Sequence, residues 1–183
     1  MNREGSLITK KIIAYAFKNS LKEKEYHKIS IKEIMADAGY RRQTFYDYFV
    51  DKEQLVLWIC EQEITENIQH FIGYEHWTDI LGRLLLYFNK NKLFYKKILI
   101  SGNQQLLDLT LLPQIEDLML RIMTEKNTSA DRKKSITEAE RFEISRFYAF
   151  AATGIIKDWV LNDCQAPLEE IKEYLIRMAD KLS

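Results

Sequence analysis

The sequence predicts an all-α protein of about nine helices, with an N-terminal three-helix helix-turn-helix head followed by a larger helical body. Six Gly and two Pro occur among 183 residues, whereas average usage would give roughly 22, so a turn-rich β architecture is disfavoured. Apolar residues recur at helical spacings, and helix-capping residues precede several of these segments. We expect the head to span residues 1–50 and the body residues 51–183.

The composition also limits where the chain acts. Two cysteines, Cys60 and Cys164, are too few and too far apart for a disulfide scaffold or a four-ligand zinc module, which favours a reduced cytoplasm. The longest uncharged runs, 98–107 and 147–156, have ten residues each, well short of the roughly 18 needed to cross a bilayer. The N-terminus leads into a charged segment, so we expect a cytoplasmic protein with no secretory signal and no membrane partner.

The charges are balanced overall but unevenly distributed. The chain has 27 basic and 27 acidic residues, and residues 1–48 hold ten Lys and Arg against six Asp and Glu. The basic excess therefore lies at one end, where it suits either a polyanion partner or an ordinary solvated surface. Charge alone leaves both interpretations open.

The first predicted helix runs from Leu7 to about Leu21. Ser6 can cap its start. Lys10 and Lys18 are two of the lysines that lie outside its apolar stripe, facing water or a polyanion. The stripe consists of Ile8, Ile12, Ile13, Ala16, Phe17 and Leu21.

Two short helices joined by a glycine turn are predicted next. Ser30 and Glu33 have the spacing of a capping box, which opens a helix that should stop at Gly39. A second helix follows, with Phe45 and Phe49 four residues apart on its apolar side. This arrangement is typical of a helix-turn-helix, whose second helix can enter the major groove of DNA.

The polar residues of the second helix suit DNA. Arg42, Gln43 and Thr44 can bond or contact base edges, and the pair of arginines adds attraction to phosphate. The hydroxyls of Tyr46 and Tyr48 can reach phosphate oxygens, although these rings could instead simply pack.

The stretch from Ile8 to Leu55 resembles the DNA-binding region of TetR-family transcriptional regulators. The resemblance is carried by Ile-Ser-Ile-Lys-Glu-Ile (29–34), Ala-Gly (38–39) and Thr-Phe-Tyr-Asp-Tyr-Phe-Val-Asp-Lys-Glu-Gln-Leu (44–55). It implies two-fold dimers, an all-helical fold of nine or ten helices and an effector pocket in the C-terminal part. The string Arg-Arg-Gln-Thr-Phe-Tyr (41–46), with Trp58 soon after, further resembles the branch named after regulators of dihydroxyacetone kinase. That branch includes activators and repressors, so the sign of regulation stays open.

One departure from the family pattern affects operator choice. Many relatives have a small Ser and a Lys-Gly pair where this chain has Arg41, Arg42 and Gln43. These larger side chains extend the reading surface, so operators of other members should not be transferred to this chain.

A lever helix is predicted from Asp51 to Phe71, between head and body. Asp51 can cap it, with Gln54 completing the box. Lys52 lies in the first turn, where helix polarity alone favours an acidic residue. The resemblance to the family places this lysine against the DNA backbone. The alternative is that Lys52 is an ordinary surface lysine. The residues expected at DNA are Ser30, Arg41, Arg42, Gln43, Thr44, Tyr46, Tyr48 and Lys52.

The body is predicted to contain helices over 78–88 and 92–100, and a third that begins at Pro113 and runs to Met123, with 106–112 as a possible extension. The polar stretch 125–138 has the composition of a linker, and we expect it to be mobile.

The last two helices are predicted at 139–162 and after Pro167. The first is apolar on more than one face, so a second copy of the chain is expected to cover one of them in a four-helix interface that would make a homodimer. Plain core packing within one chain is the alternative. The expected interface residues are Phe147, Ala151, Ala152, Ile155, Ile156, Trp159, Ile171 and Leu175.

Motifs for catalysis are missing from the sequence. There is no His-Glu-x-x-His zinc helix, no Gly-x-Ser-x-Gly elbow and no glycine pair for a phosphate loop, so we expect neither an enzyme nor a cofactor. His70 and His76 could form a metal site with Glu66 or Cys60, but their spacing is loose, and we predict no metal.

The sequence therefore predicts a dimeric regulator that binds a palindromic double-stranded DNA operator and responds to a small-molecule effector in its body. Docking of a coactivator protein on the body is the alternative. A cavity of about 300 Å³ or more with convergent polar groups would favour a small ligand. A filled body with an exposed apolar patch would favour a protein. The aromatic residues that could line an effector cavity, or equally form plain core, are Trp58, Trp77, Tyr87 and Phe94.

Overall fold

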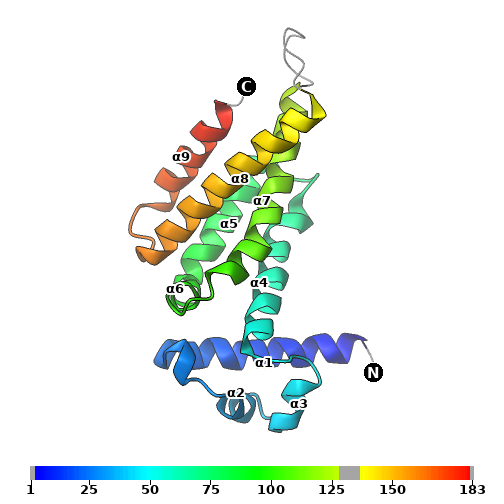
Figure 1. The fold of residues 1–183 in the computed structure, drawn as a ribbon, viewed down its shortest axis with the longest axis vertical. Coiled ribbons are helices and arrows are strands. Elements are labelled where there is room, and N and C mark those ends of the chain that lie inside the picture. The colour runs from blue at the N-terminus through cyan, green and yellow to red at the C-terminus, as the bar shows by residue number, and fades with distance from the viewer. Residues whose placement is uncertain (1–2, 128–136, 182–183) are drawn as a thin grey trace.

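The computed structural model describes residues 3–127 and 137–181, and these residues form nine α-helices, two short 3-10 turns and no strand (Figure 1). The prediction of an all-α fold is confirmed. The helices are α1 (Arg3–Glu23), α2 (Ile31–Asp37), α3 (Arg42–Tyr46), α4 (Lys52–Ile68), α5 (Trp77–Lys90), α6 (Lys92–Ile100), α7 (Gln104–Asn127), α8 (Glu138–Leu161) and α9 (Leu168–Asp180); the turns are η1 (Tyr26–Lys28) and η2 (Gln69–Phe71).

The molecule consists of a small head made by α1, α2 and α3 and an elongated body made by α5 to α9, with α4 rising from one into the other (Figure 1). The apolar residues buried in the two parts form one continuous cluster, which extends from Ile13 in α1 to Ala179 in α9. Helix α6 lies above one end of α1, so the head touches the body directly as well as through α4.

Helix α1 begins earlier than expected. It starts at Arg3, so Ser6 lies inside the first turns and cannot act as the N-cap. The stripe prediction needs a second correction, because Ile8 and Ile12 are exposed while Ile13 and Phe17 are fully buried. The apolar residues at the start of α1 therefore face outward.

Pro113 lies within α7 and does not begin a helix, contrary to the prediction. Proline in a helix interior removes one hydrogen bond and costs about 3 kcal/mol. Buried apolar residues at helical spacing continue on both sides of it, at Leu107, Leu111, Ile115 and Leu118. Burial of this stripe offsets the cost of the proline, so the helix passes through it.

Of the predicted linker 125–138, residues 128–136 lie outside the described residues, while α7 extends to Asn127 and α8 begins at Glu138. Thr137 and Glu140 form a capping box at the start of α8: Glu140 N–H donates to Thr137 Oγ1 at 3.2 Å, and Thr137 N–H donates to Glu140 Oε2 at 2.8 Å.

Among the described residues, no helix is long and apolar enough to span a membrane.

Candidate nucleic-acid interface

The predicted capping box fixes the start of α2. Ser30 is its N-cap, and its hydroxyl accepts a hydrogen bond from the Glu33 N–H, while the Glu33 carboxylate accepts from the Ser30 N–H at 2.9 Å. Lys24 also donates to this carboxylate, at 2.7 Å. The bond to Lys24 is the largest of the causes that lower the pKa of Glu33 to about 2. The hydroxyl of Ser30, an expected DNA contact, is exposed but already engaged by this box.

A glycine turn joins α2 to α3. Gly39 has φ +74°, a left-handed conformation that costs a residue with a Cβ atom roughly 1–2 kcal/mol. The Tyr40 N–H donates to the Met35 carbonyl at 2.9 Å, which closes the end of α2. The chain then turns into α3 with Arg41 as the N-cap. The helix-turn-helix predicted from the sequence is present at the expected residues.

Helix α3 has one buried side and one exposed side. Phe45 and Phe49 are fully or almost fully buried, and their ring centroids lie 5.5 Å apart. Arg41, Arg42 and Gln43 are exposed. Because the anchoring residues point into the head, the side chains around the N-terminus of α3 project from it, as entry into a major groove requires.

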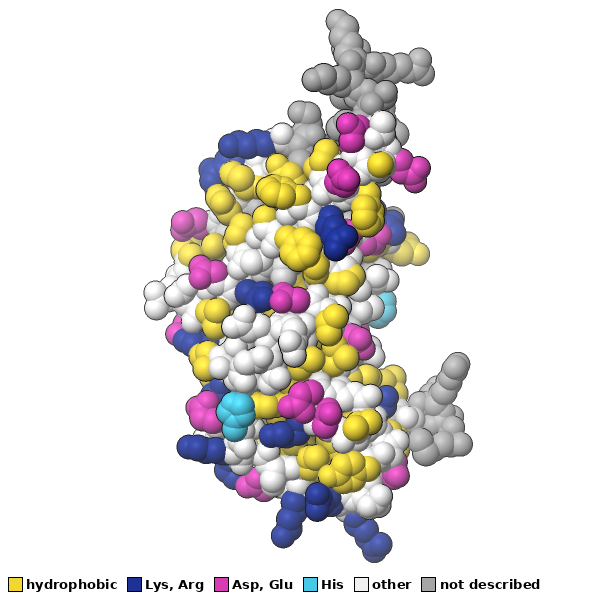
Figure 2. Space-filling view, viewed as in Figure 1, with side chains coloured by type: hydrophobic (Ala, Val, Ile, Leu, Met, Phe, Trp, Pro, Cys, Tyr) yellow, Lys and Arg dark blue, Asp and Glu magenta, His cyan; other side chains and the backbone are white. Residues whose placement is uncertain are grey.

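The remaining polar residues of α3 are less uniform. Tyr46 is 41% exposed, and its hydroxyl accepts a hydrogen bond from the Arg42 guanidinium at 3.2 Å. Thr44 is partly exposed, and Tyr48 packs against the core while keeping part of its surface in solvent. Lys and Arg side chains project from the lower edge of the molecule, the edge formed by α2 and α3 (Figures 1 and 2). This edge is the candidate DNA interface.

Lys52 has different partners from those we expected. Its ammonium donates to the carbonyl oxygens of Tyr26 at 3.0 Å and Ile29 at 2.8 Å and lies 4.4 Å from the centre of the Tyr26 ring. Partial burial lowers the pKa of this lysine. In the DNA-free chain this ammonium satisfies one carbonyl at the start of η1 and one just after its end, and the contact with phosphate stays a prediction.

An apolar cavity of about 220 Å³ lies in the body, between α5, α7, α8 and α9. It is lined by Trp77 and Leu84 of α5, Met119 of α7, Ala152 of α8 and Leu175 of α9. Such a lining can hold a small apolar group by burial but offers few hydrogen bonds to orient a polar one.

The structure does not bring the four predicted effector-lining residues together. Trp77 alone borders the apolar cavity. Trp58 and Tyr87 line a separate, more open and more polar cleft between α1, α4 and α5. Phe94 is 5% exposed and packs edge-on against Phe17, with ring centroids 6.4 Å apart. The prediction of one shared pocket is wrong, because these aromatics border two separate cavities or lie in the core.

The expected dimer residues also divide into two groups. Phe147 is 69% exposed, Ala151 is exposed, and Ala152, Ile155 and Ile171 are partly exposed. By contrast, Ile156, Trp159 and Leu175 are buried within the single chain, at 0%, 4% and 7% exposure. These three belong to the core of one chain, so their assignment to an interface is corrected.

His76 has a structural role. It is the N-cap of α5, and its Nδ1 atom accepts a hydrogen bond from the Thr78 N–H at 3.4 Å. In the part of the chain that the structure describes, no group of three His, Cys, Asp or Glu side chains could hold a metal ion.

These features define a helix-turn-helix DNA-binding protein: a short capped helix, a left-handed glycine turn, and an anchored second helix with exposed guanidinium and amide groups. The chain belongs to the TetR family of bacterial transcriptional regulators: residues 16–59 match the family model described as bacterial regulatory proteins, tetR family, and residues 75–181 match that of a transcriptional regulator C-terminal region. It is a transcriptional regulator, and the prediction that it is not an enzyme is confirmed.

Relatives of known type support this assignment. The HTH-type dhaKLM operon transcriptional activator DhaS of Lactococcus lactis subsp. lactis (strain IL1403) is 35% identical over 162 residues, which cover 88% of this chain and 84% of that protein. A solved structure of the dihydroxyacetone kinase operon activator DhaS matches with a TM-score of 0.78 and 31% identity over 96% of both chains. A TetR regulator from Streptococcus agalactiae 2603V matches in fold, with a TM-score of 0.67 and 22% identity over 96% of both chains. The predicted resemblance to the dihydroxyacetone-kinase-regulator branch is confirmed.

Proposed function

We propose that two copies of this chain bind a palindromic operator, and that occupancy of the body changes their affinity for it. The observation that carries this proposal is the geometry of α3: its buried Phe45 anchor leaves Arg42 and Gln43 exposed at the end that would meet base edges. Arg42 and Gln43 read bases, while Arg41 and Tyr46 bind phosphate. Thr44, partly exposed beside them, is a third base contact.

The proposed homodimer forms through α8 and α9. The outer side of α8 exposes Phe147, Phe150, Ala151 and Gly154. Hydrophobic side chains gather over this part of the body (Figure 2). The small residues Ala151 and Gly154, which follow Phe150 on this side, allow a second helix to approach closely, so the pair α8–α9 can form a four-helix bundle with its copy.

The signal that the body receives is proposed to be a small apolar compound in the cavity beside Trp77. Its volume of about 220 Å³ is below the roughly 300–1,000 Å³ of most ligand pockets, so the ligand must be small or the cavity must open. Trp58, Tyr87 and Phe94 are not part of this proposed site.

A coactivator protein is the second candidate, and a specific surface supports it. Leu7, Ile8, Ile12 and Tyr15 are 38–69% exposed on the outer side of α1, away from the proposed dimer helices. Four large apolar side chains on three turns of one helix are more than a solvated face needs. A partner protein could bind there and act on the head directly.

The relatives suggest the target genes. The relative from Lactococcus lactis and the solved structure both carry the name DhaS, the first as activator of the dhaKLM operon and the second as activator of a dihydroxyacetone kinase operon. We infer that this chain likewise activates an operon for the phosphorylation of a small ketose, and that it acts in the cytoplasm, where that DNA lies.

The test is to select duplexes from a random pool with the purified protein and to footprint the same protein on the DNA upstream of its own gene and that gene's neighbours. We expect an inverted repeat whose half-site centres are about 34–36 Å apart, or a multiple of one helical turn. Selection of sequences without two-fold symmetry would overturn the palindrome, and no selection at all would overturn DNA recognition.

A further inference from the structure

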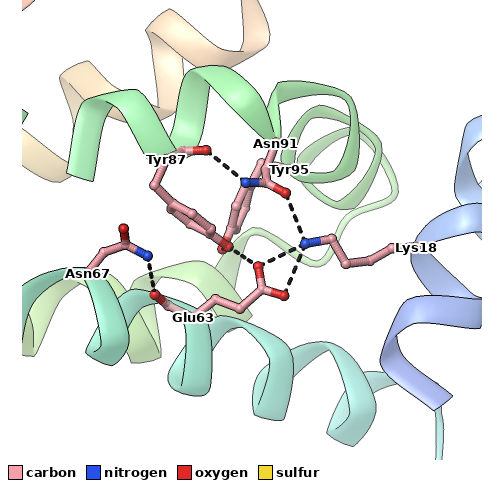
Figure 3. Close-up of polar contacts among 6 residues, drawn as sticks. All are labelled: Lys18, Glu63, Asn67, Tyr87, Asn91 and Tyr95. Atoms are coloured by element: carbon pink, nitrogen blue, oxygen red, sulfur yellow. Dashed lines mark hydrogen bonds and ion pairs between the residues drawn. The ribbon is translucent and has the colours of Figure 1, made fainter. Parts of the chain in front are cut away.

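One carboxylate connects four helices where the head meets the body. Glu63 of α4 accepts two hydrogen bonds from the ammonium of Lys18 in α1, at 2.8 and 3.0 Å. It also accepts one from the hydroxyl of Tyr87 in α5, at 2.5 Å. The Tyr95 hydroxyl of α6 lies 2.6 Å from that of Tyr87, and the Asn91 side chain accepts a third bond from Lys18 at 2.9 Å (Figure 3).

The direction of these hydrogen bonds follows from the number of hydrogens. A hydroxyl has one hydrogen, and Tyr87 donates it to the carboxylate, so Tyr95 must be the donor between the two tyrosines. Burial raises the pKa of both tyrosines well above the usual value, which keeps both hydroxyls protonated. Donation therefore runs from Tyr95 to Tyr87 to Glu63, and from Lys18 to the same carboxylate.

The environment of Glu63 differs from that of an exposed ion pair. The Lys18 and Glu63 side chains are 21% and 26% exposed, and Tyr95 is fully buried. A second ion pair, Lys11 with Glu66, connects the same two helices at 3.3 Å, but its side chains are 53% and 37% exposed. Of these two ion pairs, only Lys18–Glu63 is shielded enough from water to fix the orientation of α1 on α4.

Other contacts between head and body lie at α6. The Phe17 and Phe94 rings meet edge to face, and Lys97 donates to the Lys24 carbonyl at 3.1 Å and pairs with the exposed Glu25 at 3.8 Å. The apolar contact is non-directional, and the bonds of Lys97 reach only the segment that follows α1. The network around Glu63 supplies directional bonds from α1 and α5 to α4 at one point.

We propose that Glu63 is a positioning residue that sets the angle of the head on the body, with Lys18 as its contact on the head and Tyr87 as its contact on the body. A movement of α5, which also lines the cavity beside Trp77, changes the position of the Tyr87 hydroxyl and loosens the hold of Glu63 on Lys18. The regulatory part of this inference rests on the proposed function, whereas the mechanical part does not.

The mechanical test is hydrogen exchange of the full-length protein without DNA or ligand. Lys18→Met, Glu63→Gln and Tyr87→Phe should each accelerate exchange of the amides in the second half of α1 by about tenfold or more, because each removes hydrogen bonds that hold the partly buried Glu63 carboxylate or Lys18 ammonium in place. Amides of α8 should exchange at the wild-type rate. Unchanged exchange in α1, or an equal rise in α8, would overturn the proposal, since the latter would indicate general destabilisation.

Two comparisons separate positioning from simple loss of charge. Lys11→Met removes the exposed pair between the same helices and should change α1 exchange by less than about threefold. Lys18→Arg should restore most of the protection, and the double variant Lys18→Met/Glu63→Gln should exchange no faster than the faster single variant. Equal effects of Lys11→Met and Lys18→Met would show that the shielded network has no special role.

The regulatory test uses the duplex selected by the wild-type protein. Lys18→Met should raise the Kd by about tenfold, because a loosened head loses more conformational freedom on binding. The slope of log K against log salt should stay within about 0.3 of wild type, because Lys18 does not neutralise a phosphate. An unchanged Kd, or a slope lower by about 1, would overturn the positioning role. If the wild-type protein selects no duplex, the proposed function fails while the exchange result still decides the mechanical part.

Discussion

The ammonium of Lys52 in α4 donates a hydrogen bond of 2.8 Å to the carbonyl oxygen of Ile29, the residue before the N-cap of α2. This contact fastens the first turn of the lever helix to the start of the helix-turn-helix. A movement of α4 therefore acts on α2 at its N-terminus, at the residue next to the capping box.

Loss of this contact should weaken the head. Lys52→Met should lower the free energy of unfolding by about 1–2 kcal/mol, because two carbonyls lose a charged donor in a partly buried place. Lys32→Met, on the exposed side of α2, should change it by less than about 0.5 kcal/mol. Urea unfolding measures both. If Lys52→Met leaves stability unchanged but flattens the salt dependence of DNA binding by about 1, the lysine binds phosphate instead.

The second prediction concerns sequence reading. Gln43→Ala should cost about 1–3 kcal/mol on the selected operator and relax preference at one base position, because Gln43 is exposed beyond the buried anchor of α3. Arg41→Ala should weaken binding to all sequences alike and flatten the log–log salt slope by about 1. Binding to operator variants at several salt concentrations separates the two effects. Loss of base discrimination in both variants would contradict the division of roles.

How much of this interface could be predicted depends on the separation of the residues along the chain. Ser30 and Glu33 lie three residues apart, and Gly39 needs only its own backbone freedom, so both features were predicted from local sequence alone. The partners of Lys52 lie 23 and 26 residues away. Helical periodicity says which side of α4 is polar but not which carbonyls that side meets.

The same limit explains the errors in the body. Periodicity marked Ile156 and Trp159 as apolar, correctly, but could not distinguish burial within one chain from burial between two. The network of Lys18, Glu63 and Tyr87 was missed because its members lie 24 to 69 residues apart. Lys18 and Glu63 alone have the pattern of solvated helix residues, and Tyr87 alone has that of a core or cavity residue. No sequence signal could have joined them.

The third prediction concerns the dimer. Ala151→Glu together with Phe150→Glu should produce monomers at micromolar concentration, because both residues are exposed on the outer side of α8 and a buried carboxylate would have no partner. Tyr74→Glu, at a residue that is 90% exposed in the turn before α5, should leave the dimer intact. Sedimentation velocity measures all three proteins. A wild-type monomer would contradict the dimer itself, and a dimeric double variant would place the interface elsewhere.

Acid should remove the contribution of Glu33 to stability. Its pKa is lowered to about 2 in the folded chain, so the ionised form stabilises α2 above the ordinary pKa of about 4.3 and is lost as pH falls toward 2. The stability difference between wild type and Glu33→Gln should therefore be largest near neutral pH and should shrink between pH 5 and pH 3. Urea unfolding across this range measures it. A difference that is independent of pH would show that the carboxylate charge does not contribute.

The last prediction concerns the apolar cavity and its link to DNA. Ala152 lines the same cavity as Trp77, so Ala152→Leu should fill part of the 220 Å³ and raise the free energy of unfolding by about 0.5–2 kcal/mol. Ala139→Leu, at an exposed position in the first turn of the same helix, should have little effect. Benzene serves as the probe, since dry cavities of comparable size admit it. It should change the fluorescence of Trp77 in the wild type but not in Ala152→Leu.

By linkage, a compound that alters operator affinity must itself bind with an affinity that the operator alters by the same factor. Benzene affinity that is identical with and without the selected duplex would therefore show that the cavity is not coupled to the head, and the outer side of α1 would become the favoured site of regulation.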